Sequence, residues 1–166
     1  MHARMKMTAG NSVRISGWLP TPWKIVTEAL KLADVGPDDL VYDLGCGDGR
    51  VVVSASAQFG ARAIGFDIDP YRVRETRFQI RSNQVAHLAE VRRQDMRDIP
   101  NIHEATVVFL YLPQAAVNAL RPYLLRRCTP GTRVVSVQTW IYRWPTEKEL
   151  VVRGKHWKWQ IGLWLV

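Results

Sequence analysis

The segment Val41–Arg50 constrains the fold of this chain most strongly. It reads Val-Tyr-Asp-Leu-Gly-Cys-Gly-Asp-Gly-Arg, and a run of small and branched residues, 51–57, follows it. Gly45, Gly47 and Gly49 alternate, and because glycine has no Cβ the backbone can approach a ligand closely there. The free N–H groups at the start of the next helix point toward the same place. The pattern predicts a ligand-binding turn between a buried strand and a helix.

Acidic residues stand at the carboxyl ends of three predicted strands. Asp43 precedes the first glycine, where a carboxylate suits a ligand with a positive charge or several donors. Asp67 ends the second apolar run, and an acid at this place in a βαβ unit can hold ribose hydroxyls. Asp69 is expected to cap the next helix, with Pro70 as its first residue. A third strand is expected to end at Asp95, so three acids should share one rim of the sheet.

These motifs resemble those of a known enzyme family. Asp43–Gly49, Gly65–Asp67 and Gln94–Met96 are similar to motifs I, II and III of the class I, seven-strand, S-adenosylmethionine-dependent methyltransferases. The nicotinamide and flavin fingerprint places its third glycine one residue later. The resemblance implies an α/β, Rossmann-like three-layer sandwich, with a seven-stranded, mostly parallel sheet and an antiparallel last strand. It also implies S-adenosylmethionine as cofactor, S-adenosylhomocysteine as product, and no metal.

The motifs and the resemblance together assign cofactor contacts. We expect Asp67 to hold the ribose, Asp95 to contact the adenine amino group, and Met96 to pack on the adenine ring. The expected cofactor-binding residues are Thr21, Asp43, Leu44, Gly45, Gly47, Gly49, Asp67, Ile68, Asp95, Met96 and Leu110.

The segment ahead of the first strand indicates a subgroup. Residues 1–16 are expected to be irregular, and residues 17–36 to form a cofactor-covering segment and a helix. Thr21 is the expected N-cap and Pro22 the first helical residue. The Pro-Thr-Pro approach resembles the N-terminal element of archaeal-type protein-lysine methyltransferases. It is also similar to their mitochondrial relatives that methylate the ATP synthase c-ring protein or the adenine nucleotide translocase, and in that family the element lies over the cofactor.

The end of the fourth predicted strand, 106–112, indicates the acceptor. Methyltransferases of base amino groups usually carry an Asn/Asp/Ser-Pro-Pro-aromatic motif there, whereas this chain has Leu-Tyr111-Leu-Pro113. That sequence resembles the Tyr-Leu-Leu-Pro of the lysine-methylating family, one residue shorter. We expect Tyr111 and Trp140 to act at the acceptor amine, with Trp140 and Trp144 walling its channel. The alternatives are a core-facing Tyr111 and tryptophans that only pack locally.

The rest of the chain completes the expected sheet. A helix over 114–120 is expected to be broken or kinked by Pro122. Strands are expected at 133–137, 149–152 and 159–166. The alternation of apolar residues in the last of these predicts an antiparallel strand slotted into the sheet.

Composition and charge limit the remaining possibilities. The 166 residues suit a single domain, and no apolar run is long enough for a membrane span. Cys46 and Cys128 are too few for a disulfide framework, which favours a reducing, cytoplasmic setting. The net charge of +8 includes arginines along 72–81 and at 92–97. They form either a solvated face or a surface for RNA or an acidic protein.

We therefore interpret the chain as a single methyltransferase domain, 1–166, that methylates the ε-amine of an accessible lysine in a protein partner. Two alternatives stay open. One is a methyltransferase for a small molecule or RNA, and the other is a non-catalytic S-adenosylmethionine-binding module. A monomer is the default expectation.

Overall fold

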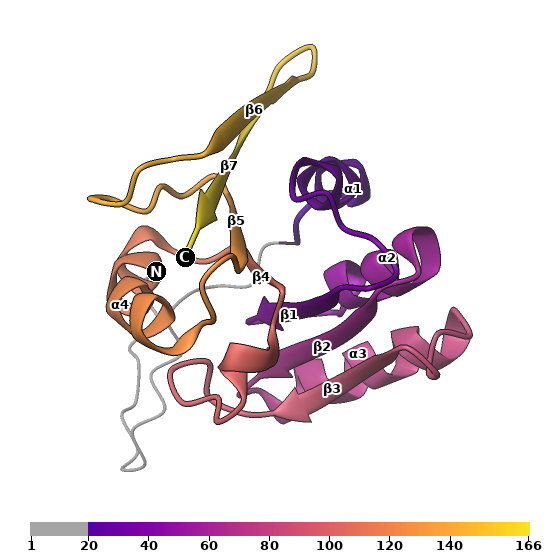
Figure 1. Ribbon diagram of the computed structural model, residues 1–166. Coiled ribbons are helices and arrows are strands. Elements are labelled where there is room, and N and C mark those ends of the chain that lie inside the picture. Colours follow the sequence, from indigo (N-terminus) through magenta and orange to yellow (C-terminus); the bar gives the residue numbers. More distant parts are fainter. Residues whose placement is uncertain (1–19) are drawn as a thin grey trace, which may run out of the picture.

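The computed structural model describes residues 20–166, which form one seven-stranded sheet (Figure 1). The strands run in the order β3-β2-β1-β4-β5-β7-β6. β1 to β5 are mutually parallel, whereas β7 is antiparallel to both β5 and β6. The strands are β1 (Leu40–Leu44), β2 (Arg62–Asp67), β3 (Ala89–Arg93), β4 (Val107–Leu110), β5 (Arg133–Val137), β6 (Lys148–Arg153) and β7 (Lys158–Leu165). The predicted Rossmann-like sheet with an inserted antiparallel strand is confirmed.

Helices cover both faces of this sheet. α1 (Trp23–Leu32), α2 (Arg50–Phe59) and α3 (Pro70–Ser82) pack on one face. α4 (Gln114–Arg127) and the short 3-10 helix η1 (Ile102–Glu104) pack on the other. All five residues of β1 are buried, as expected of a central strand covered on both sides. The carboxyl ends of β1, β2 and β4 therefore meet at one edge, where the strand order reverses between β1 and β4.

The start of α1 differs from the expectation. The helix begins at Trp23, its N-cap position is Pro22, and no side chain caps it, so Thr21 is not the N-cap. Pro22 has an extended conformation, with φ −56° and ψ 141°, and its carbonyl accepts the first-turn N–H groups of Ile25 and Val26. The helix therefore starts after the second proline, and Thr21 is free to face the cavity described below.

The start of α3 agrees with the expectation. Asp69 accepts a hydrogen bond from the N–H of Tyr71 at 2.9 Å, and Pro70 is the first helical residue. The expected irregular segment, residues 1–16, lies outside the described residues.

α4 runs as one element through Pro122, so of the expected break or kink the break does not occur. Val117 and Leu120 before the proline and Leu124 after it are buried in the same cluster against the sheet. Burial on both sides of Pro122 outweighs the loss of one backbone donor.

Candidate active site

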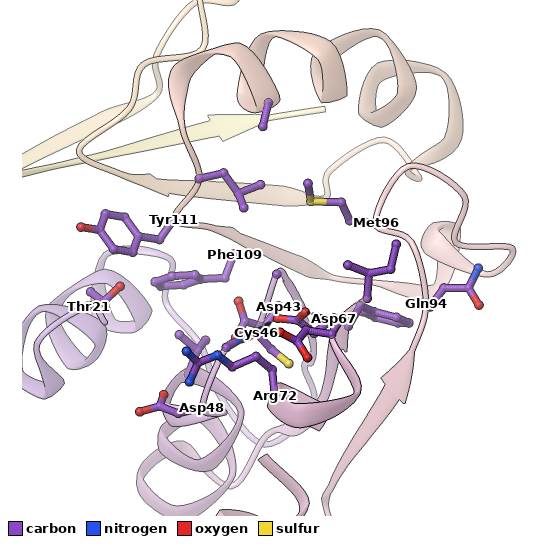
Figure 2. A pocket seen from close by; sticks show the side chains of 18 of the residues that line it. Thr21, Asp43, Cys46, Asp48, Asp67, Arg72, Gln94, Met96, Phe109 and Tyr111 are labelled. Carbon is purple, nitrogen blue, oxygen red and sulfur yellow. Dashed lines mark hydrogen bonds between the residues drawn. The ribbon is translucent and has the colours of Figure 1, made fainter. Parts of the chain in front are cut away.

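A cavity of about 550 Å³ opens at the carboxyl ends of β1, β2 and β4 (Figure 2). Most of the expected cofactor residues line it, namely Thr21, Asp43, Gly45, Gly47, Asp67, Ile68, Asp95 and Met96. Figure 2 shows Thr21 and Tyr111 toward one end, Gln94 and Met96 toward the other, and Asp43 and Asp67 between them. The cavity therefore has two distinct ends joined along an acidic floor.

Three expected cofactor residues do not line the cavity. Leu44 and Leu110 are fully buried in the core beneath it. Gly49 occupies the N-cap position of α2 with a left-handed φ of 84°. A Cβ there would lie 2.5 Å from the Cγ2 of Thr76, so this glycine lets α3 approach the turn.

The glycine turn is tied to the end of β2. The N–H of Gly45 donates to the carbonyl of Phe66 at 2.8 Å, and the N–H of Gly47 donates to Oδ2 of Asp67 at 3.1 Å. Gly45 has φ 83°, and a Cβ there would lie 2.9 Å from the Cδ2 of Leu112. The turn thus keeps its backbone exposed to the cavity at a position that only glycine fits well.

Asp43 is a buried acid of the site whose pKa lies far from its ordinary value. Its side chain is 3% exposed, and its Oδ2 has no hydrogen-bond partner among residues 20–166. Burial raises the pKa of this carboxyl well above its ordinary value, and the nearby charges of Asp67 and Asp48 raise it further. A buried, unpartnered carboxylate oxygen on a cavity wall fits a ligand group that carries positive charge or donates hydrogen bonds.

Both carboxylate oxygens of Asp67 accept hydrogen bonds from backbone N–H groups, and the residue lines the cavity. Its Oδ1 accepts from the N–H of Asp69 at 2.9 Å, and its Oδ2 accepts from Gly47. Each carboxylate oxygen accepts about two hydrogen bonds, so acceptor capacity remains for a pair of ribose hydroxyls. This arrangement is compatible with the role that the sequence predicts for Asp67.

The far end of the cavity carries the residues expected at the adenine. Asp95 lies in the loop after β3 and accepts from the backbone N–H and the Nε of Arg97, at 2.9 and 3.0 Å. These hydrogen bonds lower the pKa of Asp95. Ile68 is 38% exposed and Met96 is partly buried. The two apolar side chains can pack against a planar ring, and the adenine contacts stay a prediction.

Tyr111 lines the opposite end of the cavity, directly after β4. Its ring centre lies 5.9 Å from that of Trp159 on β7, with the rings tilted by 56°. Burial raises the pKa of the Tyr111 hydroxyl. The residue expected to meet the acceptor therefore stands on the cavity wall, beside an aromatic partner that sequence reasoning did not single out.

Trp140 and Trp144 lie elsewhere. Trp140 is not among the residues that line the cavity, and its ring packs edge-on against Trp164 at 5.1 Å. The backbone N–H of Trp140 donates to Oε1 of Gln114 at 3.1 Å. The indole N–H of Trp144 donates to the carbonyl of Leu165 at 2.9 Å. Both tryptophans anchor the loop after β5. This is the arrangement expected under the alternative that they only pack locally.

Arg50 connects the N-terminal segment to the glycine turn, a role that sequence reasoning missed. Its Nη1 donates to the carbonyl of Thr21 at 2.6 Å, and its Nε donates to Oδ1 of Asp48 at 2.9 Å. The guanidinium carbon lies 5.3 Å from the ring centre of Trp23. Arg50, Asp48 and Thr21 all line the cavity, so this clamp fixes part of its wall. Further lining residues missed from the sequence are Cys46, Phe66, Phe109, Leu112 and Pro113.

Neither a metal site nor a membrane span is found in the described part of the chain. Between residues 20 and 166, no group of three or more His, Cys, Asp or Glu side chains could hold a metal ion. Within the same range, no helix combines the length and apolar character needed to cross a membrane.

Comparison with known proteins places the chain among methyltransferases. The profile of the family described as ANTKMT methyltransferase domain matches residues 43–148. A protein-lysine N-methyltransferase of Saccharolobus islandicus is 35% identical over 150 residues, which cover 90% of this chain and 92% of that protein. A lysine N-methyltransferase of Xenopus laevis, named for the C-subunit of ATP synthase, is 31% identical over 75 residues, covering 45% of this chain and 33% of that protein.

This chain is also similar to a solved structure whose name gives RNA, and not protein lysine, as the methyl acceptor. It is an RNA methyltransferase from Salinibacter ruber in complex with S-adenosyl-L-homocysteine. The two chains superpose with a TM-score of 0.84 at 39% identity, over 89% of this chain and 94% of the other.

Proposed function

This chain belongs to the ANTKMT methyltransferase-domain family of S-adenosylmethionine-dependent enzymes, and from that membership we propose that it methylates the ε-amine of lysine in protein substrates. The observation that carries the proposal is the position of Tyr111. It stands on the cavity wall after β4, in a Leu-Tyr-Leu-Pro sequence that lacks the base-methylating pattern. The near full-length similarity to an archaeal protein-lysine methyltransferase supports it.

The cavity suits S-adenosylmethionine. That cofactor supplies a sulfonium methyl group already activated for transfer to a nucleophile. Asp43 offers an unpartnered carboxylate oxygen to a cationic group, and Asp67 offers acceptors to the ribose. Gly45 leaves room for close backbone contact where a side chain would collide. Ile68 and Met96 provide apolar surface at the other end.

The Tyr111 end of the cavity suits a neutral amine. A lysine amine has an ordinary pKa of about 10.4 and attacks only after it loses its proton. Apolar and aromatic walls disfavour the charged form, and those beside Tyr111 include Phe109 and Leu112. The Tyr111 hydroxyl has an ordinary pKa of about 10, which burial raises further, so it stays protonated near neutral pH and can orient the amine without acting as a base. These residues contribute by aligning the acceptor and excluding water.

RNA is the second candidate acceptor. The favouring observation is the 39% identity to a protein named as an RNA methyltransferase, over nearly the whole of both chains. The positive net charge of +8 is compatible with an RNA acceptor. The sequence after β4 is the feature that weighs against a base amino group.

A labelling experiment tests the proposal. The enzyme is incubated with methyl-labelled S-adenosylmethionine and a cell lysate, and the product is divided between nuclease and protease. We expect protease to release the label and nuclease to leave it in place. Asp67→Ala serves as the background control, and Asp98→Ala, an exposed aspartate outside the cavity wall, as the matched active variant. If nuclease removes the label and protease leaves it in place, the acceptor is RNA and the lysine proposal is wrong.

A further inference from the structure

Helix α3 presents aromatic and arginine side chains on the side away from the sheet. Its buried residues, Val73, Thr76 and Ile80, face the core. At 100° per residue, positions 71, 74, 78 and 81 share the opposite side of the helix. We call these residues the α3 outer stripe, and they are Tyr71, Arg74, Phe78 and Arg81.

The aromatic side chains of the stripe are unusually open to solvent. Phe78 is 66% exposed and Tyr71 is 57% exposed, and the two arginines beside them are exposed as well. A large apolar side chain gains no stability at such a position, because its surface stays in water. Two exposed rings that alternate with arginines along one helix therefore indicate a binding surface.

The positive charge of this surface is not neutralised locally. Glu75 forms an ion pair with Arg72 at 2.7 Å, and Glu90 on the neighbouring strand pairs with Arg92. Both acids are thus already engaged. The arginines of α3 without an ion-pair partner among residues 20–166 are Arg74, Arg77 and Arg81. Their charge is available to an anionic partner.

The stripe begins at the mouth of the cavity. Asp69 and Arg72, at the start of α3, line the cavity, and Tyr71 lies between them in the sequence. The guanidinium carbon of Arg72 lies 5.4 Å from the Tyr71 ring centre. From Tyr71 the stripe extends to Arg81 over about 15 Å of helix. A partner that lies along α3 would have one end near the part of the cavity wall that Asp69 and Arg72 form.

We propose that the α3 outer stripe binds single-stranded nucleic acid. Exposed aromatic rings offer stacking surfaces to unpaired bases, and the interspersed arginines neutralise the phosphates between them. An acidic protein segment would engage the arginines and leave both rings without a role. A duplex would present its phosphates but keep its bases stacked inside. The proposal does not rest on the proposed acceptor, because the bound strand is either the acceptor or a component that accompanies it.

Salt-dependent binding tests the arginines. The probe is a fluorescently labelled oligouridine of about 12 nucleotides, within the usual site size, and its anisotropy is measured across a salt titration. The variant Arg74→Gln with Arg81→Gln should lower the slope of log affinity against log salt by about 1.4, since each phosphate contact contributes about 0.7 for single strands. The matched control is Arg126→Gln with Arg127→Gln, which removes two exposed arginines from α4 and should leave the slope unchanged.

Stacking is tested separately from charge. Phe78→Ala should weaken oligouridine binding by about fivefold or more while the salt slope stays the same. Leu125→Ala, which truncates an exposed apolar side chain on α4, is the matched control and should bind as the wild type does. All of these side chains are exposed, so the variants should fold as the wild type does, which circular dichroism verifies.

Three results would overturn the proposal. One is the absence of oligouridine binding by the wild type at low salt. Another is an equal loss of slope in the α3 and α4 arginine pairs, which would mean that the charge acts from the whole surface. The last is displacement of the oligonucleotide by polyglutamate as readily as by unlabelled oligouridine. None of these measurements depends on methyl transfer, so the outcome is distinct from that of the acceptor assay.

Discussion

Burial of Asp43 makes the stability of the folded chain depend on pH. The folded-state pKa of Asp43 lies well above the ordinary 3.8 because the carboxyl is buried. Between those two values the folded state binds more protons than the unfolded chain does. Stability without cofactor should therefore fall as pH rises from about 4, and the contribution is lost once the pH passes the raised pKa.

The variant Asp43→Asn tests this directly. It removes the titrating group but keeps the shape, so its unfolding temperature without cofactor should depend less on pH than that of the wild type between about pH 4 and pH 8. At the upper end it should be at least as stable as the wild type, while calorimetry shows weaker binding of S-adenosylmethionine. Asp98→Asn, at an exposed position, is the control. Parallel pH profiles for wild type and Asp43→Asn would contradict the assignment.

Asp67 should contribute to cofactor affinity through its charge. Hydrogen bonds to charged groups contribute about 1.5–3 kcal/mol each, so Asp67→Ala should weaken binding at least about tenfold. Asp67 also accepts the N–H of Gly47, so some of this loss comes from a looser glycine turn. Asp67→Asn retains an acceptor and should lose less than the alanine variant. Unchanged calorimetric affinity in a folded Asp67→Ala protein would remove this residue from the site.

Tyr111 should affect turnover more than cofactor binding. Its raised pKa keeps the hydroxyl protonated between about pH 7 and pH 9, so a rate that climbs over this range reports deprotonation of the acceptor amine. Tyr111→Phe keeps the ring and should lower kcat while the rise with pH and the cofactor affinity persist. If the rate of Tyr111→Phe no longer rises between about pH 7 and pH 9, the group that titrates is the tyrosine and not the acceptor amine.

At the scale of elements, local patterns predicted most of the strands and helices. The central strands β1, β2, β4 and β5 follow buried runs of apolar residues, and the inserted β7 follows from its alternation. The errors arose where tertiary packing decided the outcome. α4 passes through Pro122 because the helix is buried on both sides of it, and α1 starts after the Pro22 that was expected inside it.

In the candidate site, too, local motifs predicted some residues and tertiary packing decided others. Contiguous motifs predicted that Asp43, Asp67, Gly45 and Gly47 would lie at one edge, and all four line the cavity there, because the carboxyl ends of parallel strands meet at that edge. The aromatic partner of Tyr111 is Trp159 and not the expected Trp140, since that contact joins β7 to the loop after β4. The period of β7 could have indicated it, because Trp159 shares a face with Ile161 and Leu163.

The Arg50 clamp should couple the segment before α1 to cofactor binding. Arg50→Lys keeps the charge but loses the planar fork that contacts Thr21 and Asp48 together. We expect about two- to tenfold weaker binding of S-adenosylmethionine by calorimetry, as for the loss of one ordinary hydrogen bond. Arg62→Lys, at an exposed position on β2, is the matched control. Equal affinities in the two variants would show that the clamp does not shape the site.

At the scale of the whole molecule, the sheet joins two functions at one edge. β1 and β2 supply the acids and glycines of the cofactor end, and the residues after β4 supply the acceptor end. α3 begins at the same edge and carries the outer stripe away from it, so a bound strand would have one end near the cofactor cavity. The net charge of +8 suits an anionic partner at the stripe more than it suits a lysine-rich protein acting alone.

Chemical blocking of amines tests the central claim most directly, because it separates the lysine nitrogen from every other acceptor. Lysate proteins are acetylated with an amine-selective ester until their ε-amines are converted to non-nucleophilic amides, and labelled methyl transfer by the enzyme is compared with that in untreated lysate. We expect blocking to abolish incorporation, and mass spectrometry of the untreated sample to find the new methyl groups on lysine. Incorporation that survives blocking and disappears after nuclease treatment would contradict the claim.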